Sequence, residues 1–352
     1  MNLRVFQKTG QREITLLVFL AFLLLGSAIF SLGFGQGGLY GPKEIIQALS
    51  HRISGTVPVG SMAETYTILL YLRLPRIMLA LLIGANLALS GALMQALFNN
   101  PLAEPYIVGA SSGASLGAVL AVALGAQTMF CGLNLMAVAA FAGALAATFL
   151  VLAIARRAGG LASNTLLLAG VAVGGLMQAI TSLLILQSAP NQTMPLLAWL
   201  MGNLAYRDWN YVFMLGPYTL LGATVAQMSW KMLNRLACGD EAAIYLGVSV
   251  VRVKVFLLVT ASLLAASAVA AGGIIGFVGL MVPHAMRRLV GAHYAVLLPA
   301  CLLSGGILLL WADLLARMLL SGREIPIGLV TGVLGCLFFL YLLNRDAAPI
   351  AN

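Results

Sequence analysis

Long apolar runs without any charged side chain dominate this chain. A helix needs about 20 apolar residues to cross the ~30 Å hydrocarbon core of a bilayer, so each run converts into a number of spans. Single spans are predicted in Ile14–Gly35, Ile77–Ala103, Ser163–Leu186, Trp209–Trp230, Leu289–Ala316 and Ile325–Asn344, and two each in Pro105–Ala155, which is broken near Gly132 and Asn134, and in the glycine-rich Val255–Met286. The sequence therefore predicts an all-α polytopic membrane protein of about ten transmembrane helices, with residues 1–352 forming one domain.

The composition excludes a soluble protein of this size. Only 8% of the 352 residues are charged and 61% are hydrophobic, whereas a soluble domain carries about 25% charged residues. The net charge of +9 therefore indicates basic cytoplasmic loops rather than a nucleic-acid partner. The four cysteines are interpreted as small apolar fillers without a metal site: Cys131, Cys238, Cys301 and Cys336.

The basic residues also predict an orientation. Arg4, Lys8 and Arg12 precede the first span, which places the N-terminus in the cytoplasm, and an even number of spans places the C-terminus there too. Residues 36–72 then form an external loop. Of the 19 basic residues, twelve fall inside and seven outside. The outside residues are Lys43, Arg52, Arg73, Arg76, Arg207, Arg317 and Arg323.

Three of the outside arginines need a reason to be there. Arg73 and Arg76 lie in the sequence Leu-Arg-Leu-Pro-Arg, and Arg317 follows Asp313 by four residues, so this last pair can meet on one helix face. One interpretation is interfacial snorkelling of each arginine. The other is a ring that captures carboxylates of an external partner.

Glycine is abundant, with 38 residues, and recurs in patterns such as Gly84-x6-Gly91 and Gly109-x3-Gly113-x3-Gly117. Close helix packing in lipid relies on such small residues. The pattern predicts a bundle with many close helix crossings.

Two segments break the spans. Between the second and third spans, Asn99 and Asn100 precede Pro101 and Pro105, and this combination blocks helix continuation. The segment is either an ordinary turn or a rigid turn at a pore mouth. The second segment, 276–284, carries glycines and a proline inside an apolar run, which is typical of a kinked helix lining a cavity.

The longest polar stretch predicted on the inside is 233–254. Gly239 and Gly247 bracket a predicted short helix, Asp240–Leu246, whose acidic residues lie in its first turn, where the helix dipole favours them. The stretch is either a docking surface for a cytoplasmic partner or a plain connecting loop.

The motifs present and absent narrow the transport class. The chain has no GxxxxGK[ST] motif for ATP and no HExxH motif for metal-dependent hydrolysis. Ion-coupled carriers need ionisable residues within their spans, but here Glu104 and Asp313 lie near span ends. A permease driven by a separate ATPase fits better than an ATP-independent secondary transporter or channel, which is the alternative.

At these segments the chain resembles the FecCD-type permeases of bacterial ABC importers, which carry ferric siderophores, haem and vitamin B12. The resemblance runs in order over roughly residues 70–345. The matching stretches are LRLPR (Leu72–Arg76), LALSGALMQALFNNPLAEPYIVGASSGA (Leu87–Ala114), TLLLAGVA (Thr165–Ala172), GDEAAIYLG (Gly239–Gly247), GFVGLMVPH (Gly276–His284), ADLLAR (Ala312–Arg317) and EIPIGLVTGVLG (Glu324–Gly335).

The resemblance implies a type II importer bundle in the bacterial inner membrane. It implies two permease copies, two cytoplasmic ATPase subunits that bind ATP and Mg, and a periplasmic or lipid-anchored binding protein; this chain itself needs no cofactor. By the same resemblance, the binding protein docks on Arg73, Arg76 and Arg317. The implied cytoplasmic gate comprises Asn100, Leu102, Ser163 and Asn164. The implied ATPase-coupling residues are Asp240, Glu241, Ala242, Ala243, Leu246 and Gly247, with Ile244 where the family often has arginine.

The nearly uncharged spans suit a metal chelate better than a bare cation, because a desolvated ion needs oxygen or charged partners. A ferric siderophore is the leading expected substrate. Cobalamin and haem are the alternatives within the family.

Overall fold

The computed structural model describes residues 3–35, 38–56, 58, 60–125, 129–130, 132–158, 160, 162–320 and 324–346. Cys131 and Arg323 lie outside the described residues. The chain is helical apart from two short paired strands, β1 (Met129–Phe130) and β2 (Leu133–Asn134). The helices are α1 (Leu3–Gly33), α2 (Pro42–Ser54), α3 (Ser61–Thr67), η1 (Ile68–Arg73), α4 (Leu74–Phe98), α5 (Ala110–Ala123), α6 (Leu135–Arg157), α7 (Ser163–Gln187), α8 (Pro190–Leu200), α9 (Trp209–Met228), α10 (Trp230–Leu236), α11 (Asp240–Tyr245), α12 (Val250–Gly272), α13 (Val278–Val290), α14 (Tyr294–Met318) and α15 (Ile327–Asp346).

Seven helical segments of the described chain are long and apolar enough to cross a membrane. They contain α1, α4, α6, α7, α12, α14 and α15. Together with α9 and the two shorter helices α5 and α13, of 14 and 13 residues, they are compatible with the predicted ten. The short helices lie at the two segments that were predicted to break the spans, since α5 follows 99–105 and α13 begins within 276–284.

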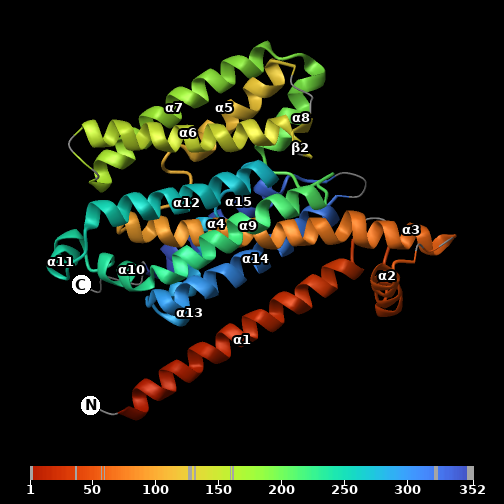
Figure 1. Cartoon of the computed structure of the whole chain (residues 1–352), viewed down its shortest axis with the longest axis horizontal. Coiled ribbons are helices and arrows are strands. Elements are labelled where there is room, and N and C mark those ends of the chain that lie inside the picture. Colours follow the sequence, from red (N-terminus) through yellow and green to blue (C-terminus); the bar gives the residue numbers. More distant parts are fainter. Residues whose placement is uncertain are drawn as a thin grey trace.

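The two ends of the bundle differ (Figure 1). The start of α1 lies at the same end as α10 and α11, whereas α2, α3 and α8 lie at the opposite end. The segment 36–72, predicted to be an external loop, contains α2, α3 and most of η1, and α3 runs through η1 into α4 as one helix from Met62 to Phe98. From the sequence, this span was predicted to start at Ile77, because Arg73 and Arg76 interrupt the uncharged run.

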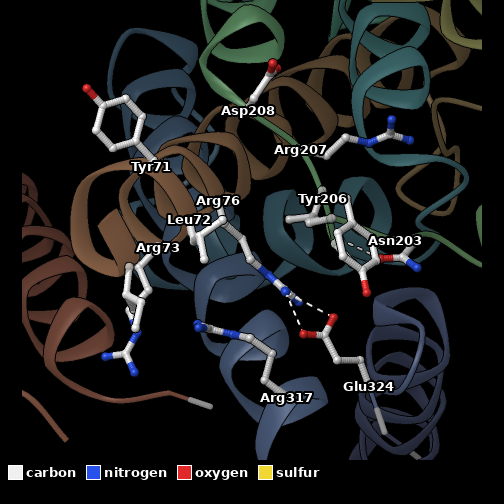
Figure 2. Close-up of a pocket in the computed structure, with 13 residues that line it drawn as sticks. Tyr71, Leu72, Arg73, Arg76, Asn203, Tyr206, Arg207, Asp208, Arg317 and Glu324 are labelled. Atoms are coloured by element: carbon white, nitrogen blue, oxygen red, sulfur yellow. Dashed lines mark hydrogen bonds and ion pairs between the residues drawn. The ribbon is translucent and has the colours of Figure 1, made fainter. Parts of the chain in front are cut away.

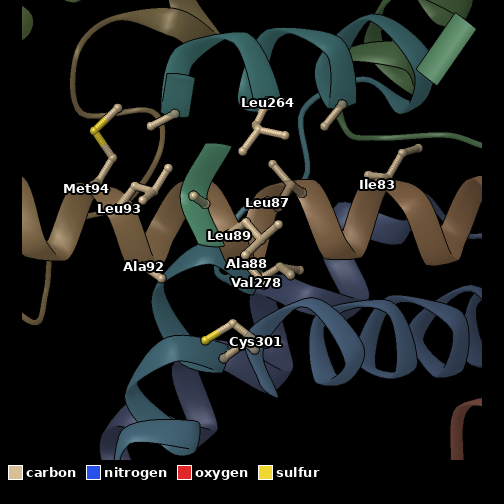
Figure 3. Close-up of a cluster of buried hydrophobic side chains, with 14 of the residues drawn as sticks. Ile83, Leu87, Ala88, Leu89, Ala92, Leu93, Met94, Leu264, Val278 and Cys301 are labelled. Carbon is tan, nitrogen blue, oxygen red and sulfur yellow. The ribbon is translucent and has the colours of Figure 1, made fainter. Parts of the chain in front are cut away.

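Helix α4 forms the core of the bundle and is buried along nearly its whole length. Figure 3 shows it passing between Leu264 of α12 on one side and Cys301 of α14 on the other. Cys301 is fully buried, as an apolar filler should be, whereas Cys238 and Cys336 are exposed.

Glycines create the closest helix crossings, as predicted. A Cβ atom added to Gly84 would lie 2.1 Å from the carbonyl oxygen of Gly305, and one added to Gly91 would lie 1.7 Å from that of Gly279. Gly113 has the same relation to Gly143, at 2.3 Å. These distances leave no room for any side chain, so α4 touches α13 and α14 backbone to backbone.

Candidate functional site

A widened helical turn carries Arg73 and ends just before Arg76, two of the predicted docking arginines. Residues Ile68–Arg73 form a π-helix, in which the N–H of Leu74 donates to the carbonyl of Leu69. In this pattern the carbonyl of Leu70 would accept from residue 75, but that residue is a proline without an N–H group. The indole Nε1 of Trp209, on α9, donates to the Leu70 carbonyl instead, at 3.0 Å. The proline and the tryptophan together stabilise the wide turn beside Arg73 and Arg76.

The guanidinium of Arg76 bridges two carboxylates. Its Nε and Nη2 atoms lie 2.9 Å from Oδ1 of Asp313 on α14, and its Nη1 lies 2.9 and 3.0 Å from the two oxygens of Glu324. Figure 2 shows the Arg76 and Glu324 side chains pointing toward each other. Arg76 is 12% exposed, so it is the most accessible of the three predicted docking arginines.

Arg317 forms the helix-face pair that its spacing predicts. Its Nε lies 3.0 Å from Oδ2 of Asp313, and its Nη2 donates to the hydroxyl of Ser31 on α1 at 3.1 Å. Only 4% of its surface is exposed. Asp313 is fully buried between Arg76 and Arg317, so this carboxylate compensates two buried positive charges.

Arg73 is equally buried, with 4% exposed, and it binds the backbone that follows α1. It donates to the carbonyls of Leu32, Gly35 and Gly38 at 2.9, 3.1 and 2.7 Å, and it lies over the ring of Tyr40 at 4.8 Å. The structure thus brings the three arginines together but encloses Arg73 and Arg317. In this arrangement both stabilise contacts to α1 and its following loop.

A cavity of about 770 Å³ opens beside these arginines. Several residues that sequence reasoning gave no role line it, including Glu324, Asn203, Tyr71, Tyr206, Arg207 and Asp208 (Figure 2). Tyr206 is fully exposed and has a φ of 59°, an unusual backbone conformation for a residue with a side chain. In the sequence, only Arg207 pointed to this wall of the cavity, because it is one of the seven basic residues that were predicted to lie outside.

At the other end of the bundle, α11 forms the predicted short helix, one residue shorter than expected. Gly239 and Gly247 bracket it with φ values of 98° and 78°. Ala243 is fully buried, whereas Ile244, Tyr245 and Leu246 are 60%, 91% and 52% exposed.

A buried cation anchors this helix to the bundle. Lys254 of α12 is 2% exposed and pairs with Asp240 at 2.5 Å. Glu241 and Gly247 are exposed and Ala242 is half-buried. The helix is therefore fixed to the bundle through Asp240, and it exposes an apolar tip formed by Ile244, Tyr245 and Leu246.

The segment 99–109 makes a compact turn after α4. Asn99 adopts the left-handed conformation that ends the helix, and the Asn100 side chain accepts a hydrogen bond from the Leu102 N–H at 2.9 Å. Both Asn100 and Leu102 are exposed. At the start of α7, Ser163 is half-buried and Asn164 exposed, and among the described residues no hydrogen bond joins these two to Asn100 or Leu102.

The same turn contacts the second broken segment. The Tyr106 hydroxyl donates to the carbonyl of Ile275 at 3.1 Å, and a Cβ on Gly279 would lie 2.5 Å from Pro105. Burial raises the pKa of the Glu104 carboxyl above its ordinary value. The two helix-breaking segments thus pack against each other at the starts of α5 and α13.

Comparison with known proteins gives one consistent result. Residues 23–345 match the FecCD transport family. The chain is 43% identical to the cobalamin import permease BtuC of Halobacterium salinarum, over 88% of this chain and 80% of that protein. It is 37% identical to the hemin transport permease HmuU of Yersinia pestis (93% and 95% covered) and 36% identical to the Fe(3+) dicitrate permease FecD of Escherichia coli (95% and 99% covered).

A solved structure shares the same architecture. It is described as a metal-chelate type ABC transporter in an inward-facing conformation, and it superposes with a TM-score of 0.82 at 31% identity, covering 94% of this chain and 99% of its own. This similarity extends over both ends of the bundle and its core. The chain belongs to the FecCD transport family of ABC importer permeases.

Proposed function

We propose that this chain carries a metal chelate across the bacterial inner membrane into the cytoplasm, and that a ferric siderophore is the leading candidate substrate. One observation carries the proposal: a basic cavity and an exposed apolar helix lie at opposite ends of one membrane-spanning bundle. The cavity suits a partner that delivers substrate from outside. The helix suits a partner that supplies energy inside.

The assembly we propose contains two copies of this permease, two ATPase subunits and a substrate-binding protein. The binding protein docks its acidic residues at the cavity beside Arg73, Arg76 and Arg317. Arg76 contributes most directly because it is the most exposed of the three.

On the cytoplasmic side, where both termini lie in this proposal, α11 inserts its tip into a cleft of an ATPase subunit. The exposed Ile244 and Tyr245 make this contact apolar where related sequences often use an arginine. Asn100, Leu102, Ser163 and Asn164 form the cytoplasmic gate, which opens and closes as α11 moves with the ATPase.

Cobalamin is a second candidate substrate. The permease named for cobalamin import shares 43% identity with this chain, compared with 36% for the one named for ferric dicitrate. Haem is the third candidate, through the 37% identical hemin permease. All three are chelates whose ligands cover the charge of the metal.

The test is substrate uptake by proteoliposomes that contain this permease, its co-purifying ATPase and its binding protein. The substrates offered are a ferric hydroxamate, a ferric catecholate, cobalamin and haem. Accumulation of one of them that requires ATP and all three components supports the proposal and identifies the substrate. Flux through the permease alone, indifferent to ATP, would instead establish an ATP-independent transporter or channel.

A further inference from the structure

The two carboxylates that hold Arg76 differ in how firmly they are fixed. Asp313 is fully buried and binds both Arg76 and Arg317. Glu324 is 29% exposed and its carboxylate binds Arg76 alone among the described residues. Each carboxylate occupies its own side of the Arg76 guanidinium, because Asp313 takes the Nε and Nη2 atoms and Glu324 takes Nη1. Glu324 can therefore leave while Asp313 stays.

Glu324 also lies next to the backbone contacts that hold the start of α15. Three residues later α15 begins, and its first two N–H groups, of Ile327 and Gly328, donate to the carbonyls of Gly202 and Met201 at 2.9 and 3.0 Å. The N–H of Ile325 donates to Ala316 at the end of α14. The Arg76–Glu324 pair is thus the side-chain link between α4 and the start of α15.

The charges around the cavity favour an external carboxylate once Glu324 leaves. Arg73, Arg76 and Arg317 contribute three positive charges, and Asp313 and Glu324 compensate two of them. Arg207 and Asp208 add one charge of each sign to the lining. With Glu324 displaced, Nη1 of Arg76 faces a cavity of about 770 Å³, which has room for an incoming side chain. A planar guanidinium accepts a new carboxylate in the same two-oxygen geometry.

We propose that Glu324 is an internal competitor for the docking site. A carboxylate of the binding protein replaces Glu324 on Arg76, and the displaced residue releases the outer end of α15 from α4. The inference rests on the proposed docking at this cavity. It adds that docking is an exchange of one carboxylate for another, so that partner binding is transmitted directly to a membrane-spanning helix.

The central variant is Glu324→Gln in the intact permease–ATPase complex in nanodiscs, with affinity measured for the binding protein that co-purifies with it. The exchange predicts tighter binding, by about fivefold, because a partly exposed ion pair no longer competes. The matched control is Glu64→Gln on α3, which is exposed near the same end and removes the same charge. The control should leave affinity unchanged.

A second measurement requires no partner. Hydrogen–deuterium exchange of the Ile327 and Gly328 amides should be faster in Glu324→Gln than in the wild type or in Glu64→Gln. Binding protein added to the wild type should produce the same acceleration.

The outcomes separate the two proposals. If Arg76→Glu abolishes binding while Glu324→Gln leaves both affinity and amide exchange unchanged, docking stands and the carboxylate exchange is wrong. If Arg76→Glu binds the protein as well as the wild type does, the docking assignment itself fails. Weaker binding by Glu324→Gln would also overturn the exchange, because Glu324 would then be part of the docking surface.

Discussion

At the scale of single residues, the buried carboxylate of Asp313 determines the electrostatics of the end of the bundle that carries the three arginines. It lies within 3.0 Å of both Arg76 and Arg317, and none of its surface is exposed. A charge in such surroundings is costly unless it is paired, and removing one partner leaves the others uncompensated. Asp313 is therefore required for the fold independently of any docking role of its neighbours.

We expect Asp313→Asn to lower the free energy of unfolding by about 3–5 kcal/mol, the range observed when one member of a buried ion pair is removed. Thermal unfolding in detergent measures the loss. Glu64→Gln is the control, since that exposed carboxylate has no ion pair among the described residues, and it should unfold as the wild type does. Equal stability of the two variants would show that Asp313 does not compensate the arginines.

Local spacing predicted the Asp313–Arg317 pair, but it could not predict the rest of this cluster. The pair lies on one helix face, four residues apart, so a single periodicity determines it. Arg76 and Glu324 are separated by 248 positions, and the carbonyls bound by Arg73 come from a different helix end. Such contacts depend on how α1, α4 and α15 pack, which no local pattern specifies.

At the scale of elements, backbone contact between helices determines how α4 is held. Gly91 of α4 faces Gly279 of α13, and the absent side chains allow the two backbones to touch. In lipid such packing takes the place of a hydrophobic driving force. The glycine patterns predicted close crossings, but the sequence did not identify which glycines pair.

Gly91→Ala should destabilise the bundle by about 1–3 kcal/mol, as overpacking of a filled core does, because the new methyl group would overlap the Gly279 carbonyl. Gly26→Ala on α1 is the matched control, since nothing lies within 4 Å of that position, and better helix propensity should leave it neutral or slightly stabilised. The midpoints of thermal unfolding compare the two variants. A Gly91→Ala protein as stable as Gly26→Ala would show that α4 and α13 separate without cost.

The sequence predicted some helix boundaries more accurately than others. Uncharged runs located the long spans, and the prolines and asparagines of 99–105 correctly predicted a break after α4. The helix of the second span begins earlier than the uncharged run at Ile77, since it continues through Arg73 to Met62. A charge count ends a span at an arginine, whereas here buried carbonyls and carboxylates satisfy the arginines and the helix continues.

At the scale of the whole molecule, the two candidate interaction sites lie at opposite ends of one bundle (Figure 1). Signals between them must pass through helices that cross the membrane. The tip of α11 is exposed at the end opposite the cavity, with Tyr245 91% exposed and nearby Ala243 buried.

Tyr245→Ser should reduce ATP-driven uptake by about tenfold, because a large aromatic side chain at the centre of an interface typically contributes that much to binding. Thermal stability of the isolated permease should not change, since the side chain packs little within this chain. Val251→Ser, which removes an exposed apolar side chain near the same end but outside α11, is the control. Equal uptake by the two variants would argue against α11 as the coupling element.

The π-helix at Ile68–Arg73 has a consequence for how the surface at this end of the bundle can change during evolution. Each residue of an α-helix advances the chain by about 100° around the helix axis, and a π-bulge accommodates about one extra residue without breaking the helix. Helix α3 is therefore rotated about the helix axis relative to α4, and Pro75 and Trp209 stabilise the turn between them. Gain or loss of a single residue here would rotate α3 against an unchanged α4, so one small insertion or deletion would turn the side chains of α3 toward a different partner.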